Sequence, residues 1–534
     1  MTLLIASGIV VFATVISIII NRQLLPKVSI NYISMIIGAI LALIPLTNKI
    51  MGDFHAELFM GLIVAPLLFF EGQYTRMNMV GHNFRLIVSL TVGMVILCTI
   101  VAGFGSALIA SVGLPLAFIL AAISTPTDAT ATESVTVGLK LPEKIASSLK
   151  MESLFNDASG IILLNIAILW YVKGHIDYAE TLGSFIYSAV GGVILGSIIS
   201  FLLVYIRQNL FRSRSNFGNN TYNNGTPFLV TYVLTPIIIY YLSESIEVSG
   251  IIAVVFAGLI HNAEAERGML TNPKAMYDGT QLVDMISDVL NSFVFVVLGI
   301  MLIRTASDPN VTYHGSMIWI IVGLVLYLAN LIVRYVYVRL VRHYNNYDGW
   351  VFSLGGIHGA VTFALAFTVA ESQVNTADYN LVIMSESLLI LLSMIVPTII
   401  FRFVLPKEDN DPELAELVIS IRQQLIDKGI SEVKQMDISQ EFKDAIIFDL
   451  KSQDGQTTFK QFVKEWQRMI RHPEYTDSQV KQIMRVFTQV FHAERKLLID
   501  LYQSKPKLDE ESFNKLYQEI AIAEVAVLEY DIRR

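Results

Sequence analysis

Residues 116–139 read LAFILAAISTPTDATATESVTVGL, an apolar run long enough to cross a membrane, with a proline and an aspartate near its centre. Pro126 has no N–H and its ring clashes with the preceding helical turn, so we expect the helix to open near the middle of the membrane. An opened helix frees backbone carbonyls and exposes the ends of two half-helices. A simple proline kink, in which neighbouring Ser and Thr hydroxyls satisfy the backbone, is the alternative.

The rest of the chain shares this apolar character. Of its 534 residues, 54% are hydrophobic and 16% are charged, whereas soluble domains carry about 25% charged residues. Apolar blocks of about 20 residues recur as far as residue 405, and we predict an all-α polytopic membrane protein in contact with lipid. The first block has no basic leading region, so we expect a span and not a removed signal peptide. The net charge of −8 argues against a nucleic-acid partner.

Hydropathy predicts about thirteen spans. Their approximate ranges are 3–21, 28–47, 57–72, 86–112, 116–139, 147–172, 181–206, 227–245, 248–262, 281–304, 316–338, 350–371 and 379–403. Lys and Arg gather in alternate connections, and these residues accumulate on the cytoplasmic side of membranes. We therefore expect a multi-pass protein of the inner (cytoplasmic) membrane, with the N-terminus outside the cell and the C-terminus in the cytoplasm.

The composition changes abruptly at Pro406. Apolar residues then recur at helical spacing between charged ones, for example at Val486, Phe487, Val490 and Phe491. We predict a transmembrane domain over residues 1–405 and a cytoplasmic helical domain over residues 406–534. The second domain has no phosphate loop, no Cys/His set at metal spacing and no catalytic constellation, so we expect neither an enzyme nor a cofactor. It is either a regulatory or oligomerising domain, with an unidentified ligand in the regulatory case, or a solvated appendage.

The sixth predicted span carries polar residues that indicate a binding site. Ser153 and Asp157 are four residues apart and share one helical face, and Asn156 lies beside them. Ionisable residues at bilayer depth are costly and mark ion or proton pathways. A carboxylate that binds either H⁺ or a small cation needs partial desolvation and nearby oxygen ligands. Asp157, Ser153, Asp128 and the freed backbone at Thr127 supply such a set, so we expect Na⁺ or K⁺ to bind there.

A second acid in the same span, Glu152, lies on the adjacent face and needs a permanent partner at this depth. Arg334, in the eleventh span, has apolar neighbours on both sides. We predict a structural salt bridge between the two residues. The alternative is that Arg334 extends to the cytoplasmic interface along its apolar stem.

The twelfth predicted span contains a second candidate break. Residues 355–359 read Gly-Gly-Ile-His-Gly, and glycine destabilises helices. The two candidate breaks lie seven spans apart, which fits two six-helix repeats joined by a single helix, with the second repeat inverted. We therefore predict two inverted six-helix repeats that bring crossed broken helices together.

Four stretches in combination resemble the bacterial monovalent cation:proton antiporter-1 (sodium/proton exchanger) family. They are PTD at 126–128, ESLFND at 152–157, SGIIAVVFAGLI at 249–260 and NSFVFVVLGI at 291–300. The resemblance covers about residues 1–405 and implies an elevator-type homodimer. It also implies that Asp157 carries the proton and the cation, with Asp128 and Ser153 as ligands. Glu71, at the end of the third span, corresponds to a glutamate of the family.

The resemblance has two further implications for the site. The pair Asn156-Asp157 marks the electroneutral branch of the family, and the family's Glu–Arg pair falls on Glu152 and Arg334. Competition of one cation and one proton for Asp157 then gives secondary active 1:1 exchange of Na⁺ for H⁺. Exchange of K⁺ for H⁺ is the alternative, because cavity size decides between the two cations. A cation channel and an ion-sensing membrane receptor are rival classes, and the sequence has no repeated filter-like motif for conduction.

Three residues depart from the family pattern and leave ion selectivity open. His358 replaces the arginine of the motif GGLRGAV, so either a fixed charge is lost or a second titrating group is gained. Glu133 and Glu386 stand where apolar or small residues are expected. Glu133 is compatible with a cytoplasmic funnel, and Glu386 with a partner of His358 or with a water-facing position. We treat these three residues and Glu71 as gate or accessory candidates.

Overall fold

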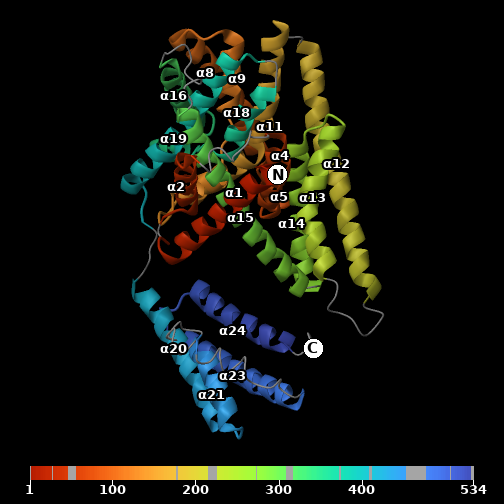
Figure 1. Cartoon of the computed structure of the whole chain (residues 1–534), viewed down its shortest axis with the longest axis vertical. Helices are drawn as coiled ribbons and strands as arrows, with labels where there is room; N and C mark the ends of the chain where they lie inside the picture. The colour runs from red at the N-terminus through yellow and green to blue at the C-terminus, as the bar shows by residue number, and fades with distance from the viewer. Residues whose placement is uncertain are drawn as a thin grey trace. The chain divides into compact units, whose positions relative to one another are not determined.

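Helices form the regular structure throughout the described part of the chain (Figure 1). The computed structural model describes residues 2–26, 28–45, 56–175, 178–214, 225–271, 273–307, 317–371, 374–407, 412–452, 463, 477–505 and 507–530. The chain divides into two compact units, Met1–Lys407 and Glu408–Arg534. No residue in the described ranges belongs to a β-strand, and one isolated antiparallel bridge pairs Leu139 with Lys407.

The first unit is a bundle of mostly apolar helices. Its first half contains α1 (Thr2–Gln23), α2 (Ile30–Leu43), α4 (Ala56–Phe59), η1 (Met60–Val64), α5 (Ala65–Gln73), α6 (Met77–His82), α7 (Phe84–Val88), η2 (Ser89–Met94), α8 (Val95–Ala110), α9 (Leu114–Ile123), α10 (Ala129–Val135) and α11 (Glu143–Lys173). Its second half contains α12 (Tyr178–Arg214), α13 (Gly225–Ser245), α14 (Gly250–Thr271), α15 (Pro273–Ser307), α16 (Ile318–Leu340), α17 (Asn346–Leu354), α18 (Ala360–Glu371) and α19 (Thr376–Val404).

Seven helices within the described ranges are long and apolar enough to cross a membrane. They are Ile5–Gln23, Phe84–Ala110, Glu143–Lys173, Ile186–Arg207, Met276–Arg304, Ile318–Leu340 and Thr376–Val404. Shorter apolar helices of 10–17 residues accompany them at Ile30–Leu43, Leu114–Ile123, Leu229–Ser245, Gly250–Ala265 and Ala360–Val369. These seven helices are fewer than the thirteen or so spans predicted from hydropathy, partly because some predicted spans are interrupted and form shorter helices. The number of spans and the inverted repeats stay predictions.

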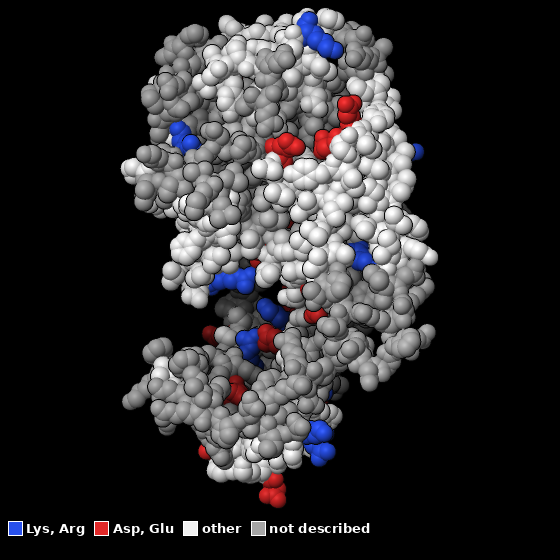
Figure 2. All heavy atoms as spheres, turned by 45° about the vertical axis from the view of Figure 1, so that its right-hand side comes forward, with Lys and Arg blue, Asp and Glu red and all other residues white. Residues whose placement is uncertain are grey.

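Apolar side chains cover much of the outside of this unit. On α12 the exposed large apolar residues recur at helical spacing, at Ile186, Val190, Ile194, Ile198, Phe201 and Tyr205. Figure 2 views the unit from the side that carries α12 and shows a broad face with few charged side chains. Such a surface suits a hydrocarbon environment better than water.

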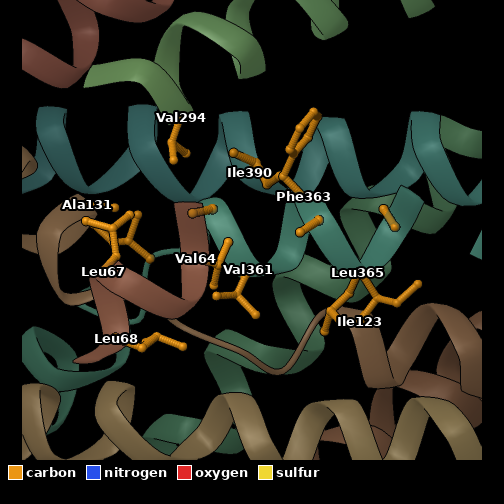
Figure 3. Packing of buried hydrophobic residues seen from close by; sticks show 14 of the residues in the cluster. Val64, Leu67, Leu68, Ile123, Ala131, Val294, Val361, Phe363, Leu365 and Ile390 are labelled. Carbon is orange, nitrogen blue, oxygen red and sulfur yellow. The ribbon is translucent and has the colours of Figure 1, made fainter. Parts of the chain in front are cut away.

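Segments that are distant in sequence pack together inside the first unit. Figure 3 shows Val64 of η1, Leu67 of α5, Val294 of α15, Phe363 of α18 and Ile390 of α19 around one buried apolar region. Lipid tails are as apolar as these side chains, so close van der Waals packing between helices is what stabilises the arrangement.

The fifth predicted span is interrupted as the position of Pro126 predicts. α9 ends at Ile123 and α10 begins at Ala129, so residues 124–128 lie outside any helix. The Thr125 N–H bonds back to the Ala122 carbonyl at 3.2 Å, which closes the last turn of α9. The helix therefore opens over several residues, and the alternative of a simple proline kink is wrong.

The twelfth predicted span is interrupted over residues 355–359, between α17 and α18. This segment crosses the first opened segment, since the Asp128 N–H donates to the Ile357 carbonyl at 2.7 Å. The Thr132 hydroxyl also donates to the Gly355 carbonyl at 2.9 Å. The freed backbone groups of the two broken helices thus satisfy one another, as buried backbone groups must in a membrane.

The second unit consists, in its described residues, of four amphipathic helices. They are α20 (Pro412–Gln435), α21 (Gln440–Ser452), α23 (Asp477–Ser504) and α24 (Glu510–Tyr530). The residues singled out from their helical spacing, Val486, Phe487, Val490 and Phe491, are all buried. They pack with apolar residues of the other three helices, including Ile421 of α20, Leu450 of α21 and Leu516 of α24.

Candidate ion-binding site

Asp128 joins the two interrupted helices. It is the N-cap of α10, and its Oδ1 accepts from the Ala131 N–H at 3.0 Å and from the Thr130 hydroxyl at 2.7 Å. Its Oδ2 accepts from the Ala360 N–H, at the start of α18, at 3.2 Å. One carboxylate therefore satisfies unpaired N–H groups at the beginnings of two half-helices, where the helix dipoles favour negative charge.

Polar residues of α11 hold the opened segment of the fifth span. The Ser153 hydroxyl donates to the Thr127 carbonyl at 2.8 Å and accepts from the Ala129 N–H at 2.9 Å. Asn156 Nδ2 donates to Thr127 Oγ1 at 2.8 Å. Ser153, Asn156 and Thr127 are all buried. The arrangement gathers backbone and side-chain oxygens from two elements in one small region.

Asp157 is the buried acid beside these oxygens. It is 2% exposed, and its Oδ1 has no hydrogen-bond partner among the described residues. The same holds for Oδ1 of Asn156. One turn further on, a Cβ added to Gly160 would lie 2.6 Å from the ring of Pro126, so α11 runs directly against the opened segment. Buried oxygens normally have partners; the carboxylate oxygen suits a hard cation or a proton, and the amide oxygen suits a hard cation.

Further carboxylates lie within electrostatic range of Asp157 or Asp128. Glu71, half-buried at the end of α5, is within electrostatic range of Asp157 and Asp128. Glu133 of α10 is exposed and interacts with Lys150. Clustered acids make the local electrostatic potential more negative and so attract cations.

Glu152 and Arg334 form a buried ion pair. The guanidinium contacts both carboxylate oxygens, with 3.0 Å between Nη2 and Oε2. Arg334 also donates to the Phe352 carbonyl at 3.3 Å and lies 4.8 Å from the centre of the Phe352 ring. Both charged side chains are at most 4% exposed. The guanidinium is thus enclosed by protein, unlike in the alternative in which it extends to the interface.

His358 links the two opened segments and does not pair with Glu386. Its Nδ1 lies 2.7 Å from the Pro126 carbonyl oxygen, and its backbone N–H donates to the Ser393 hydroxyl at 3.1 Å. Glu386 is 1% exposed, and neither carboxylate oxygen has a partner among the described residues. The prediction that Glu386 pairs with His358 is therefore wrong, because the ring of His358 contacts the opened segment. The prediction that Glu386 faces water is also wrong, because the packing of α19 buries it.

Several contacts around the site were not predicted from the sequence. Asn330 of α16 donates to the Ser124 hydroxyl at 3.0 Å, and the Thr362 hydroxyl donates to the Pro126 carbonyl at 3.1 Å. A second buried ion pair, between Arg207 of α12 and Glu264 of α14, was also not predicted. Arg207 lies one residue beyond the predicted span 181–206, whereas α12 continues to Arg214. The sequence signal for this pair is Glu264, which lies two residues beyond the predicted span 248–262 and within α14.

Residues 9–407 match the family described as sodium/hydrogen exchanger, transmembrane. This chain belongs to that family. The crossed broken helices and the buried acid described above lie within the matched range.

Curated relatives of this chain are named as cation/H⁺ antiporters. The sodium, potassium, lithium and rubidium/H⁺ antiporter of Bacillus subtilis (strain 168) is 28% identical over 532 residues, which cover 96% of this chain and 76% of the relative. An antiporter of the same name from Bacillus pumilus (strain SAFR-032) is 30% identical over 411 residues, which cover 73% of this chain and 60% of the relative.

A solved structure shares the fold. The sodium proton antiporter MjNhaP1 from Methanocaldococcus jannaschii, at pH 8, has a TM-score of 0.59 and 20% sequence identity, covering 76% of this chain and 98% of that one. The family and the fold together make this exchanger-family chain a multi-pass membrane transporter and not an enzyme.

Proposed function

We propose that the chain exchanges a monovalent cation for a proton, and that both bind in turn to Asp157. The observation that carries the proposal is Oδ1 of this buried acid, which has no hydrogen-bond partner among the described residues and lies on α11 beside the crossing of two broken helices. Oxygens of Asp128, Ser153 and the Thr127 backbone complete a ligand set for Na⁺ or K⁺. Asn156 orients Thr127, and Glu71 is an accessory carboxylate at the same site.

Competition for one carboxylate makes the exchange obligatory. Deprotonated Asp157 binds the cation, and protonated Asp157 releases it. A charged group is costly to move through a low-dielectric region, so the site crosses easily only when a cation or a proton has neutralised it. Each half-cycle then carries one positive charge, and the exchange is electroneutral with 1:1 stoichiometry.

The packing of the first unit supports an elevator mechanism in a homodimer. α2 packs against α15 and α5 against α14, whereas α8, α9, α11, α16 and α19 contact one another. We assign the first set to a fixed scaffold that carries the dimer interface. The second set, with α10, α17 and α18, is the moving core that bears Asp157.

The orientation and the second unit belong to the same proposal. About thirteen spans in two inverted repeats place the N-terminus outside and the C-terminus in the cytoplasm, following the distribution of Lys and Arg. Residues 408–534 then form a cytoplasmic domain. Its amphipathic helices and mixed charge suit a regulatory role in pH homeostasis.

A broad cation preference is the second candidate for selectivity. The two Bacillus relatives are named as antiporters of sodium, potassium, lithium and rubidium. Carboxylate, hydroxyl and carbonyl oxygens bind all of these ions, and cavity size decides among them. We therefore propose Na⁺/H⁺ exchange first, with K⁺/H⁺ exchange by the same site as the alternative.

Proton exchange in liposomes, followed with a pH-sensitive dye, tests the function. The purified chain should dissipate a preformed proton gradient when Na⁺ is added outside, and Asp157→Asn should reduce this signal to that of empty liposomes. Asp288→Asn, which changes an exposed acid on α15, is the matched control and should exchange like wild type. Persistent exchange in Asp157→Asn would remove this residue from its role.

The same liposomes separate the rival classes. Adding K⁺, Li⁺ or Rb⁺ in place of Na⁺ gives the order of apparent KM values. An imposed membrane potential should leave the exchange rate unchanged, because no net charge moves. A rate that followed the potential would favour a channel or an electrogenic antiporter instead.

A further inference from the structure

The last turn of α5 is held by polar contacts outside the ion site. Gln73 Nε2 donates to the hydroxyl of Tyr232 on α13. Asn262 Nδ2, on α14, donates to the Gln73 carbonyl at 2.6 Å. Gln73 and Tyr232 are buried. The end of one helix is thus tied to two others through its side chain and its backbone.

The buried ion pair of Arg207 and Glu264 packs against the ring of Tyr232. The guanidinium lies 4.9 Å from the centre of the Tyr232 ring, and the two charged side chains are 3% and 6% exposed. A buried ion pair is a weak stabiliser of a fold, because desolvation offsets the attraction. Here the Arg207 guanidinium holds the Tyr232 ring in place, and the ring in turn places its hydroxyl beside Gln73.

The same turn of α5 presents Glu71 to the ion site. Residues two apart on a helix point to nearly opposite sides. Gln73 contacts α13 and α14, and Glu71 is on the side within electrostatic range of Asp157 and Asp128.

Close packing prevents this turn from sliding. A Cβ added to Gly72 would lie 2.7 Å from the Val255 carbonyl oxygen and 3.3 Å from the Cα of Gly258. The Thr75 hydroxyl also donates to the Glu71 carbonyl at 2.9 Å. The backbone that carries Glu71 is therefore seated directly on α14.

We propose that Gln73, Tyr232 and Asn262, backed by the Arg207–Glu264 pair, are positioning residues that fix Glu71 toward the cation and so set cation affinity. The inference rests on the proposed function, in which Glu71 is an accessory carboxylate of the site. The contacts given above run between α5, α12, α13 and α14, and α14 packs on each of the other three helices (Figure 1).

The location of the network predicts which kinetic constant it controls. Its contacts lie outside the helices assigned to the moving core, so they persist through the transport cycle. Asp157 moves with the core, so Glu71 acts on the bound cation only in the state in which the core faces it. Loss of a contact made in that bound ground state weakens binding and does not slow turnover. The network therefore acts on the KM for the cation and leaves the maximal rate unchanged.

Tyr232→Phe is the cleanest test, because it removes one hydroxyl and keeps the ring over Arg207. Loss of one buried hydrogen bond should raise the KM for Na⁺ by about three- to tenfold at fixed pH, with the maximal rate within about twofold of wild type. Tyr240→Phe changes another buried tyrosine of α13 and should leave both constants unchanged. A reduced maximal rate with unchanged KM, or a KM no different from that of Tyr240→Phe, would overturn the proposal.

A double variant shows whether the network acts through Glu71. In the Glu71→Gln background, Tyr232→Phe should raise KM no further, since coupled residues are not additive. An equal rise in both backgrounds would refute positioning through Glu71, even if the proposed exchange stands. A wild-type KM in Glu71→Gln alone would instead refute the assignment of Glu71 in the proposed function. Thermal stability of each purified variant identifies any effect that comes from misfolding.

Discussion

Gly359 lies directly against the carboxylate of Asp128, at the point where the two opened segments cross. A Cβ added to Gly359 would be 2.1 Å from Oδ2 and 2.8 Å from Cγ of Asp128. The neighbouring Ala360 N–H is a donor to the same Oδ2. A glycine is therefore required for the backbone of one broken helix to reach the cap of the other.

Gly359→Ala should disrupt this crossing. The added methyl group must displace Asp128, which removes the shared cap of α10 and α18, and lost caps and overpacking each cost about 1–3 kcal/mol. We expect exchange in liposomes to fall by at least about tenfold, since misplacing a site by a fraction of an ångström has effects of that order. Gly8→Ala, at a helical glycine with open space around it, should behave like wild type. Normal exchange in Gly359→Ala would show that the crossing tolerates a side chain.

Glu152→Gln should destabilise the first unit more than a double variant of the ion pair. The single change leaves the Arg334 guanidinium buried without its carboxylate, which costs about 3–5 kcal/mol, whereas removing both charges is often close to neutral. We expect a lower melting temperature for Glu152→Gln and a partial recovery in Glu152→Gln/Arg334→Met. Thermal unfolding in detergent measures both. Equal melting temperatures for the single and double variants would contradict a structural role for the pair.

Ser153→Ala should weaken cation binding. It deletes the hydroxyl that donates to the Thr127 carbonyl and accepts from the Ala129 N–H. Loss of a buried hydrogen-bonding group costs about 1–3 kcal/mol, which corresponds to a rise in the KM for Na⁺ of about five- to hundredfold. Ser147→Ala, earlier on the same helix, is the control. An unchanged KM would exclude this hydroxyl from the site.

The crossing of the broken helices was predictable because it depends on local chemistry. Pro126 removes a backbone donor, and three glycines within residues 355–359 weaken the helix locally, so both breaks have a signal in the sequence itself. The pairing of Glu152 with Arg334 followed from the cost of an isolated charge in a membrane. The Gln73–Tyr232 contact had no such signal, because amide and hydroxyl side chains are common in membrane helices and their partners depend on helix packing. The conformation of His358 was equally out of reach, since a histidine accepts many partners.

The second unit contains a buried acid that makes its stability depend on pH. Glu494 of α23 is 4% exposed, and its Oε1 has no partner among the described residues. It lies over Gly429 of α20, where an added Cβ would be 2.5 Å from that oxygen. Burial raises the pKa of Glu494 to about 8. Lys428 and Glu432 of α20 pair with each other nearby, and Arg495 pairs with Glu524.

The packing of α20 on α23 should therefore weaken as the pH rises. The folded state holds the Glu494 proton up to about pH 8, and the unfolded state releases it near pH 4–5, so stability falls by up to about 1.4 kcal/mol per pH unit between these values. Above about pH 8 the loss is complete. Amide hydrogen exchange of the full chain, corrected for intrinsic rates, should show less protection in residues 421–433 at pH 8 than at pH 6.

Glu494→Gln should remove this dependence, because an amide does not titrate. We expect protection of residues 421–433 in this variant to be the same at pH 6 and pH 8, and higher than wild type at pH 8. Glu416→Gln, which changes an exposed acid of α20, should keep the wild-type trend. The same pH trend in Glu494→Gln would assign the effect to another group.

His358 contacts the first opened segment through its ring and α19 through its backbone N–H. Its Nδ1 is 2.7 Å from the Pro126 carbonyl oxygen, and its own N–H donates to Ser393. Glutamine also offers a side-chain N–H, so His358→Gln should keep exchange within about threefold of wild type, whereas His358→Ala should lower it by about tenfold or more. His358→Arg should fail as well, because His358 is buried and the longer arginine side chain must displace its packed neighbours. Exchange rates in liposomes rank the three variants. Equal rates for the glutamine and alanine variants would show that the contact with Pro126 does not hold the crossing, and a fully active arginine variant would show that the site accommodates the family's usual charge.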